Sequence, residues 1–178
     1  MREIVLCRHG ATESNSEGRF LSRTDVPLSP LGIAQCLQIQ IEFDAFDFER
    51  CLVSPMRRCL ETREIVAPQP QFEVEAALRE IDFGTWEGQT LESLQAADPS
   101  GLAQRRRDPV YFRPPQGESF ADVAERLRPV VEKLRRPLRW LVVAHRGTLG
   151  VLERLLRDLP LESQAVKGLE PAEFRIVT

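Results

Sequence analysis

Two apolar runs, each ending at a histidine, constrain the fold of this chain more than any other feature. One run, residues 4–7, precedes Arg8 and His9, and the other, residues 141–144, precedes His145. Short apolar runs bounded in this way are typical of strands buried in a parallel sheet. Open α/β sheets place their chemistry at the carboxyl ends of such strands. Because the chain has only 2 histidines, we expect both to be functional.

Strand-like runs alternate with helical patterns along the chain. Strands are expected at residues 3–7, 50–53 and 139–144, and a terminal strand at 173–177. Apolar residues at helical spacing form three stripes: Ile33, Leu37 and Ile41; Val123, Leu127, Val130, Val131 and Leu134; and Leu149, Leu152, Leu155, Leu156 and Leu159. Pro129 is expected to kink or split the second helix. The alternation predicts an α/β fold, a three-layer α/β/α sandwich with a mainly parallel central sheet.

The length of 178 residues fits a single domain covering residues 1–178. Only the segment at about 98–119 departs from the alternating pattern. It carries the run Arg105-Arg106-Arg107, Arg113 and the pair Pro114-Pro115 with little periodicity. We interpret it as an irregular, lid-like segment over the active-site end of the sheet, with a solvated surface loop as the alternative.

Composition excludes several classes of protein. A formal charge of -3 and a pI of about 5.6 lack the broad positive field of a nucleic-acid binder. No apolar stretch approaches the length of a membrane span, and the N-terminus lacks the pattern of a signal peptide, so a cytoplasmic protein is expected. The four cysteines, which show no CxxC spacing, are interpreted as reduced, mostly buried thiols: Cys7, Cys36, Cys51 and Cys59.

The residues around the first histidine suit phosphoryl transfer. A neutral imidazole can attack phosphorus directly, which splits hydrolysis into the formation and the breakdown of a phosphohistidine. Arginine holds phosphate oxygens with a planar fork that never loses its charge. Arg8 is next to His9, and Arg58 follows the predicted strand at 50–53. Such cations also lower the pKa of a histidine and keep it neutral.

The leaving alkoxide needs a proton, which a carboxylic acid in a partly desolvated cleft can supply. Residues 78–88 offer three candidates, Glu80, Asp82 and Glu87, and position alone does not choose between them. Glu87 and Trp86 are better interpreted as structural residues, the glutamate as a hydrogen-bond acceptor and the indole N–H as a satisfied donor.

Four motifs follow one another through nearly the whole chain. They are Arg8-His9-Gly10 with Thr12 and Asn15, extended by Pro27-Leu28-Ser29 with Gly32 and Gln35; Ser54-Pro55-Met56 with Arg58 and Thr62; Leu78-Arg79-Glu80; and Val143-Ala144-His145 with Gly147. In this order they resemble the motifs of the histidine phosphatase superfamily, branch 1, the phosphoglycerate mutase-like group.

The resemblance implies a role for each matched residue. His9 is the phosphorylated nucleophile, Glu80 is the proton donor, and Asn15 helps to form the pocket. The phosphoryl group is cradled by Arg8, Arg58 and His145. No metal or other cofactor is implied.

Two further arginines are expected to bind substrate. Arg146 stands where relatives often have a small residue, and it either reaches the substrate or points away from it. Arg113, or one arginine of the run 105–107, is expected to contact the part of the substrate that is not phosphoryl. The alternative for the run is a solvated helix face. Ser119 is expected to cap the next helix, with Asp122 in its first turn.

Within the superfamily, the short chain favours a phosphatase over a mutase. The strings at 81–88 and 114–120 are similar to those of the α-ribazole phosphatases of cobalamin assembly, and broad-specificity phosphatases share much of them. The expected partner is a small-molecule phosphomonoester, without nucleic acid or membrane. A phosphoglycerate mutase stays open as an alternative, and so does a homodimer. A non-catalytic phospho-ligand binder is set aside because both the nucleophile and the acid are present.

Overall fold

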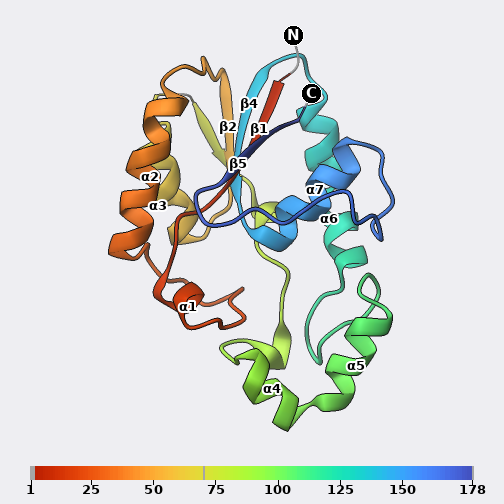
Figure 1. Ribbon diagram of the computed structural model, residues 1–178. Coiled ribbons are helices and arrows are strands. Elements are labelled where there is room, and N and C mark those ends of the chain that lie inside the picture. Colours follow the sequence, from red (N-terminus) through yellow and green to blue (C-terminus); the bar gives the residue numbers. More distant parts are fainter. Residues whose placement is uncertain (1–2, 70, 178) are drawn as a thin grey trace.

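A central sheet organises the computed structural model, which describes residues 3–69 and 71–177 (Figure 1). Within these residues the sheet has 5 strands in the order β3-β2-β4-β1-β5. The strands are β1 (Glu3–Arg8), β2 (Arg50–Val53), β3 (Phe72–Val74), β4 (Arg139–Ala144) and β5 (Phe174–Val177). All neighbouring pairs are parallel except β1 and β5, which are antiparallel. The predicted α/β fold with a mainly parallel sheet is therefore confirmed.

Helices cover both faces of the sheet. They are α1 (Glu13–Ser16), α2 (Pro30–Phe43), α3 (Arg57–Val66), α4 (Leu91–Ala97), α5 (Pro99–Arg107), α6 (Phe120–Leu134) and α7 (Arg146–Leu156). In Figure 1, α2 and α3 lie on one side of the sheet and α6 and α7 on the other. Helices α4 and α5 lie beyond the lower end of the sheet, toward which β1 and β4 run.

Strand β1 shows why the first apolar run is continuous. Ile4 and Leu6 belong to the core cluster that includes residues of α6 and α7, whereas Val5 and Cys7 belong to the cluster that includes residues of α2 and α3. All four side chains are completely buried. Successive residues of a strand face opposite sides of the sheet, so a strand covered on both sides has no polar position.

Helix α6 is continuous through Pro129, so the predicted split of this helix is wrong. Its predicted apolar stripe is buried on both sides of the proline, from Val123 to Leu134. This packing outweighs the missing backbone hydrogen bond, which costs an isolated helix about 3 kcal/mol. The predicted cap is confirmed, since the Ser119 hydroxyl accepts from the Asp122 N–H.

Helix α2 is present, but the stripe that indicates it faces outward. Ile33, Leu37 and Ile41 are 43%, 52% and 77% exposed. The buried residues of α2 are Gly32, Cys36 and Phe43. A Cβ at Gly32 would clash with the carbonyl oxygen of Ala11, so this glycine lets α2 lie close to the segment that follows β1.

The segment at 98–119 is helical in its first half, so the prediction of an irregular segment is wrong for α5. This helix packs on a small separate core of Trp86, Leu94 and Leu102 rather than on the sheet. Asp98 caps α5 through the Gly101 N–H and also accepts the indole N–H of Trp86, 3.1 Å away. With so small a core to cover, α5 needs few apolar residues, which is why its periodicity is weak.

Two further observations concern membrane-spanning helices and the cysteines. None of the described helices is long and apolar enough to cross a membrane. All four cysteines are free and buried, as expected for reduced core thiols.

Candidate active site

The two histidines meet because their strands are neighbours. β1 and β4 pair in parallel with Arg8 opposite Ala144, so the next residues, His9 and His145, leave the sheet side by side. Their ring centroids are 5.1 Å apart. Both rings are buried, and the sequence prediction that the strand ends bring them together is confirmed.

His9 is held as a neutral imidazole. Its Nδ1 lies 2.7 Å from the carbonyl oxygen of Gly10, which only accepts hydrogen bonds, so Nδ1 carries the proton and Nε2 keeps its lone pair. Burial, and then the charges of Arg58 and Arg8, lower the pKa of His9 to about 3. The imidazole is therefore in its neutral form at pH 7.

The ring of His145 packs edge-on against the ring of His9. Its Nε2 lies 2.8 Å from the Ser54 hydroxyl and 3.5 Å from the Cys59 sulfur. Burial, and then His9 and Arg58, hold the pKa of His145 well below its usual value. His145 is not among the described residues that line the main cavity. Sequence reasoning assigned no role to Ser54, although it lies in the second motif at the end of β2.

Arg8 and Arg58 supply fixed positive charge. Arg58 is completely buried, and its terminal nitrogens donate to the carbonyl oxygens of Thr24 and Ser22 at 3.0 and 3.2 Å. Nη1 of Arg8 donates to the Leu169 carbonyl at 2.9 Å. The buried Nε of each arginine finds no hydrogen-bond partner among the described residues. Both side chains line the main cavity, where their charge can stabilise an anion.

Glu87 fixes the loop that orients Arg58. Its carboxylate accepts the backbone N–H groups of Ser22 and Thr24 at 2.9 and 3.0 Å, and both hydroxyls as well. Burial raises the pKa of Glu87, but these hydrogen bonds outweigh it and lower the pKa overall. The structure thus confirms the prediction that Glu87 is a hydrogen-bond acceptor.

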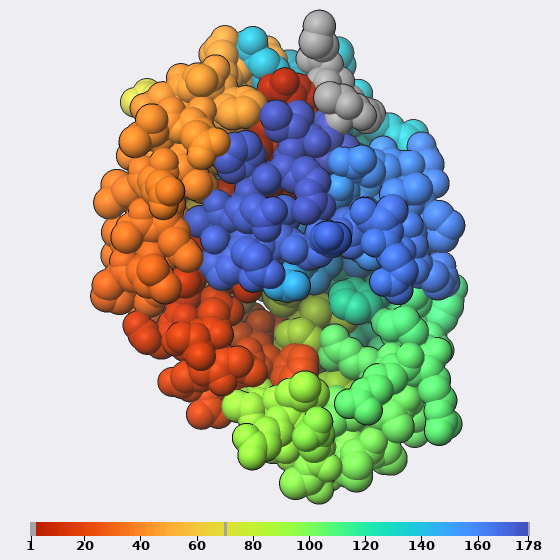
Figure 2. All heavy atoms as spheres, in the orientation of Figure 1, coloured from red at the N-terminus to blue at the C-terminus, as the bar shows by residue number. Residues whose placement is uncertain are grey.

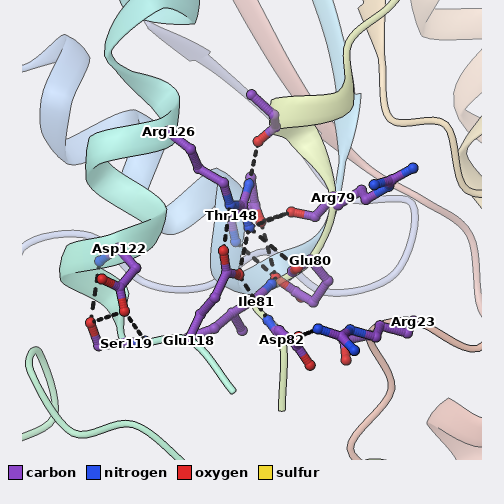
Figure 3. Close-up of polar contacts among 12 residues, drawn as sticks. Arg23, Arg79, Glu80, Ile81, Asp82, Glu118, Ser119, Asp122, Arg126 and Thr148 are labelled. Carbon is purple, nitrogen blue, oxygen red and sulfur yellow. Dashed lines mark hydrogen bonds and ion pairs between the residues drawn. The ribbon is translucent and has the colours of Figure 1, made fainter. Parts of the chain in front are cut away.

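Of the three candidate acids, only Glu80 reaches the main cavity. Figure 3 shows that Asp82 points toward Arg23, with which it forms an ion pair. The Glu80 carboxylate lies at the N-terminus of α7. Its Oε1 accepts from Ile81 N and Thr148 N, each at 3.0 Å, and its Oε2 from Gly147 N at 3.1 Å.

The close approach of α7 to this carboxylate requires a glycine. A Cβ at Gly147 would lie only 2.7 Å from Oε1 of Glu80. Because Oε2 accepts a single hydrogen bond within the described chain, it retains room for a transferable proton.

A cavity of about 460 Å³ lies at the carboxyl ends of the strands. Its inner end is polar, and its outer wall combines apolar side chains with charged ones, among them Arg19, Arg105, Arg146, Arg154 and Glu162. The inner end holds Arg8, His9, Asn15, Arg58 and Glu80; the apolar wall holds Phe20, Leu21, Ile81, Phe83, Val110, Phe120, Val151, Leu161 and Val166. In Figure 2 the red, green and blue segments that carry these residues meet around a hollow below the centre of the face.

Two of the remaining predicted site residues line this cavity. Asn15 does so, with its Oδ1 3.1 Å from the backbone nitrogen of Thr12, which donates to it. Arg146 does so as well, and its guanidinium donates to the Glu170 carboxylate at 2.6 Å.

Arg113 is not brought to the cavity. Its Nε donates to Asp122 at 2.6 Å, and this pairing is the main reason that the pKa of Asp122 falls to about 2. The geometry therefore gives no support to the prediction that Arg113 binds substrate, because its charge is already paired at the start of α6.

Arg105 belongs to the run 105–107, the other expected contact, and it does reach the cavity. It lines the cavity, with its guanidinium carbon 5.6 to 5.7 Å from the ring centroids of Phe20, Phe83 and Trp86. No hydrogen bond or ion pair to another described residue holds it. The solvated helix face is thus wrong for Arg105, whose aromatic neighbours come from distant segments.

The sequence matches a known protein family over nearly its whole length. The model of the histidine phosphatase superfamily (branch 1) matches residues 4–178. The human protein 6-phosphofructo-2-kinase/fructose-2,6-bisphosphatase 1 is 34% identical over 152 residues, which are 85% of this chain and 32% of that protein. The chain thus spans about a third of the length of the curated relatives it matches.

Solved structures agree over the whole chain. The α-ribazole phosphatase of Shigella flexneri matches with a TM-score of 0.89 and 25% identity, covering 99% of this chain and 90% of that one. A mycobacterial glucosyl-3-phosphoglycerate phosphatase in complex with VO3 matches with a TM-score of 0.91 and 29% identity, covering 100% and 93%.

Proposed function

The chain belongs to branch 1 of the histidine phosphatase superfamily, and from that premise we propose that it is a phosphomonoester hydrolase that forms a phosphohistidine on His9. One observation carries the proposal. A neutral imidazole lies at the inner end of the cavity with two buried guanidinium groups whose Nε donors are unpartnered. That arrangement suits a phosphoryl group, whose negative charge the two arginines stabilise.

In the first step, Nε2 of His9 attacks phosphorus in line with the ester bond. The bond between phosphorus and the leaving oxygen breaks, and Glu80 gives that oxygen its proton. The Nδ1–H bond to the Gly10 carbonyl stabilises the positive charge that develops on the ring. Arg8 and Arg58 hold the phosphoryl oxygens without having to reorganise, because their own contacts already fix them.

In the second step, water attacks the phosphohistidine. Glu80, now a carboxylate, takes the proton of this water, the bond between phosphorus and nitrogen breaks, and phosphate leaves. His9 and Glu80 thus return to the protonation states in which they began the first step, and Arg8 and Arg58 stay charged throughout.

For the substrate we propose α-ribazole 5'-phosphate first. The likeness to the Shigella α-ribazole phosphatase supports this choice, and so does the apolar outer wall, against which the aromatic base of a nucleotide can pack. The strings at 81–88 and 114–120 point the same way.

Arg105 favours a second substrate class. An unpaired guanidinium beside the apolar wall suits a second anionic group at the far end of the substrate. Fructose 2,6-bisphosphate carries such a group, and so does glucosyl-3-phosphoglycerate, and both compounds appear in the names of relatives.

Phosphate release from a panel of phosphomonoesters, measured in the presence of a chelator, tests both the proposed reaction and the proposed substrates. The panel holds α-ribazole 5'-phosphate, fructose 2,6-bisphosphate, glucosyl-3-phosphoglycerate, 3-phosphoglycerate, glycerol 2-phosphate and p-nitrophenyl phosphate. We expect release by the wild type and none by His9→Ala. A kcat/KM about a hundredfold above the rest, or about 2.7 kcal/mol of discrimination, identifies the substrate. Isomerisation of 3-phosphoglycerate without phosphate release would contradict hydrolysis.

A further inference from the structure

The proton donor Glu80 lies in a segment that has no regular structure of its own. Residues 79–83 connect two short 3-10 turns, Ala76–Leu78 and Gly84–Trp86, and pair with no strand. Helix α7 binds the carboxylate itself, but hydrogen bonds within a helix or sheet do not fix the main chain that carries it. Other side chains must supply that constraint.

Arg126 supplies it from α6. Figure 3 shows its guanidinium reaching from the helix toward the segment that carries Glu80. The guanidinium donates to the carbonyl oxygens of Arg79 and Glu80 at 3.0 and 3.3 Å, and also to that of Ala77. The planar fork of an arginine can hold several acceptors in one fixed geometry, which a lysine cannot.

Glu118 completes the arrangement on the other side of Glu80. Its carboxylate accepts from Nε and Nη2 of Arg126 at 3.1 and 3.2 Å, and from the Asp82 N–H at 3.0 Å. Its own backbone N–H donates to the Asp82 carbonyl at 2.8 Å. The peptide groups before and after Glu80 are thus held by one charged pair, Arg126 and Glu118.

We propose that Arg126, oriented by Glu118, is a positioning residue that aims the Glu80 carboxyl group at the leaving oxygen. Arg126 is not among the described residues that line the main cavity, so it acts through Glu80 and not on the substrate. The inference rests on the proposed hydrolysis, in which Glu80 protonates the leaving group. It assigns a function to a residue outside all four sequence motifs.

Leaving-group dependence separates this role from a merely structural one. Nitrophenolate leaves without protonation, whereas the alkoxide of glycerol 2-phosphate needs the proton of Glu80. The comparison uses kcat/KM, which reports the first step alone, because the second step is common to both substrates. We expect Arg126→Met to lower kcat/KM for glycerol 2-phosphate by about 10- to 100-fold and for p-nitrophenyl phosphate by less than about threefold. Arg126→Lys should lie between the wild type and Arg126→Met. Equal losses on both substrates would overturn the proposal.

Arg128→Met is the matched control. Arg128 lies on the same helix, is exposed, and pairs only with Glu125 within the described chain. Its replacement should leave the ratio of the two rates unchanged. If Arg126→Met does not fold, Glu118→Gln tests the same pair and should change the ratio in the same direction.

A double substitution tests whether Arg126 acts through Glu80. In a Glu80→Gln background the donor is already lost, so Arg126→Met should lower the remaining glycerol 2-phosphate rate by less than about threefold. A full additional loss would mean that Arg126 acts independently of Glu80, against the proposal. If the wild type releases no phosphate, the proposed function itself is refuted. If the wild type is active and Arg126→Met leaves the ratio of the two rates unchanged, only this inference is refuted.

Discussion

The two ends of the cavity are built in different ways. At the inner end, His9 directly follows β1, and Arg58 lies in the first turn of the helix after β2. Both side chains are buried and held by hydrogen bonds to backbone carbonyl groups. The outer end takes Phe20, Arg105 and Leu161 from a loop, a peripheral helix and a second loop. The inner end therefore has one geometry set by the sheet, while the outer end can vary without disturbing it.

The relatives illustrate the consequence of this difference. Two solved structures match the fold with TM-scores of 0.89 and 0.91, yet their names give α-ribazole phosphate and glucosyl-3-phosphoglycerate chemistry. A fixed inner end and a variable outer end predict that proteins of one fold act on different phosphomonoesters. The following predictions test that division, from the largest expected effect to the smallest.

Replacement of His9 by alanine should lower kcat by at least about ten-thousandfold, because no other imidazole and no thiol lines the described cavity. Steady-state phosphate release on the best substrate of the panel measures this effect. A variant that keeps a tenth of the activity would show that the inner end does not perform covalent catalysis.

Replacement of Arg58 by methionine should lower kcat/KM by about 100- to 1000-fold, comparable to the loss of one donor to a developing anion. The adjacent Arg57 is the matched control, since it is exposed and pairs with Glu61 on the surface. Arg57→Met should change kcat/KM by less than about twofold. Similar losses in the two variants would remove the distinction between a buried and a surface arginine.

Stability should depend on pH through the inner end. Because burial lowers the pKa of folded His9 to about 3 from 6.5, the unfolded chain binds the proton first as the pH falls below about 6.5. The stabilisation by the neutral ring is therefore complete above that pH and declines between about pH 6.5 and 3, with about 2 kcal/mol lost by pH 5.

Urea denaturation at pH 7 and pH 5 measures this contribution. His9→Gln should lose about 2 kcal/mol less than the wild type between these two values. Arg105→Met, at the outer end, should show the same pH difference as the wild type. An identical difference in all three proteins would mean that His9 is not buried as a neutral ring.

Replacement of Arg105 by methionine should raise KM about tenfold for a substrate with a second anionic group and change kcat by less than about twofold. The KM for p-nitrophenyl phosphate should stay the same. Arg106→Met provides the control, since Arg106 is exposed and does not line the cavity. An unchanged KM for every member of the panel would remove Arg105 from the substrate site.

The inner end could be predicted from the sequence because strand periodicity carries the information. Continuous apolar runs identify parallel strands, and residues that follow such strands meet at one edge of the sheet. His9, His145 and Arg58 come together for that reason alone. Their motif resemblance added the choice of Glu80, which position within residues 78–88 did not give.

The outer end could not be predicted, because its contacts join segments that are distant in the sequence. Arg105 packs against Phe20, which lies far along the chain, and no local pattern distinguishes it from Arg106. Arg113 does not reach the cavity for a similar reason, since its partner Asp122 is fixed by the cap of α6. The stripe on α2 shows that apolar periodicity identifies a helix without identifying its buried face.

A covalent intermediate on His9 tests the central claim most directly. The protein is mixed with a radiolabelled phosphomonoester substrate, quenched in alkali within one turnover, digested and mapped by mass spectrometry. The account predicts one phosphoryl group on His9, stable to base and labile to acid, and none in His9→Ala. Turnover by the wild type without any phosphorylated His9, even when Glu80→Gln slows the second step, would contradict it.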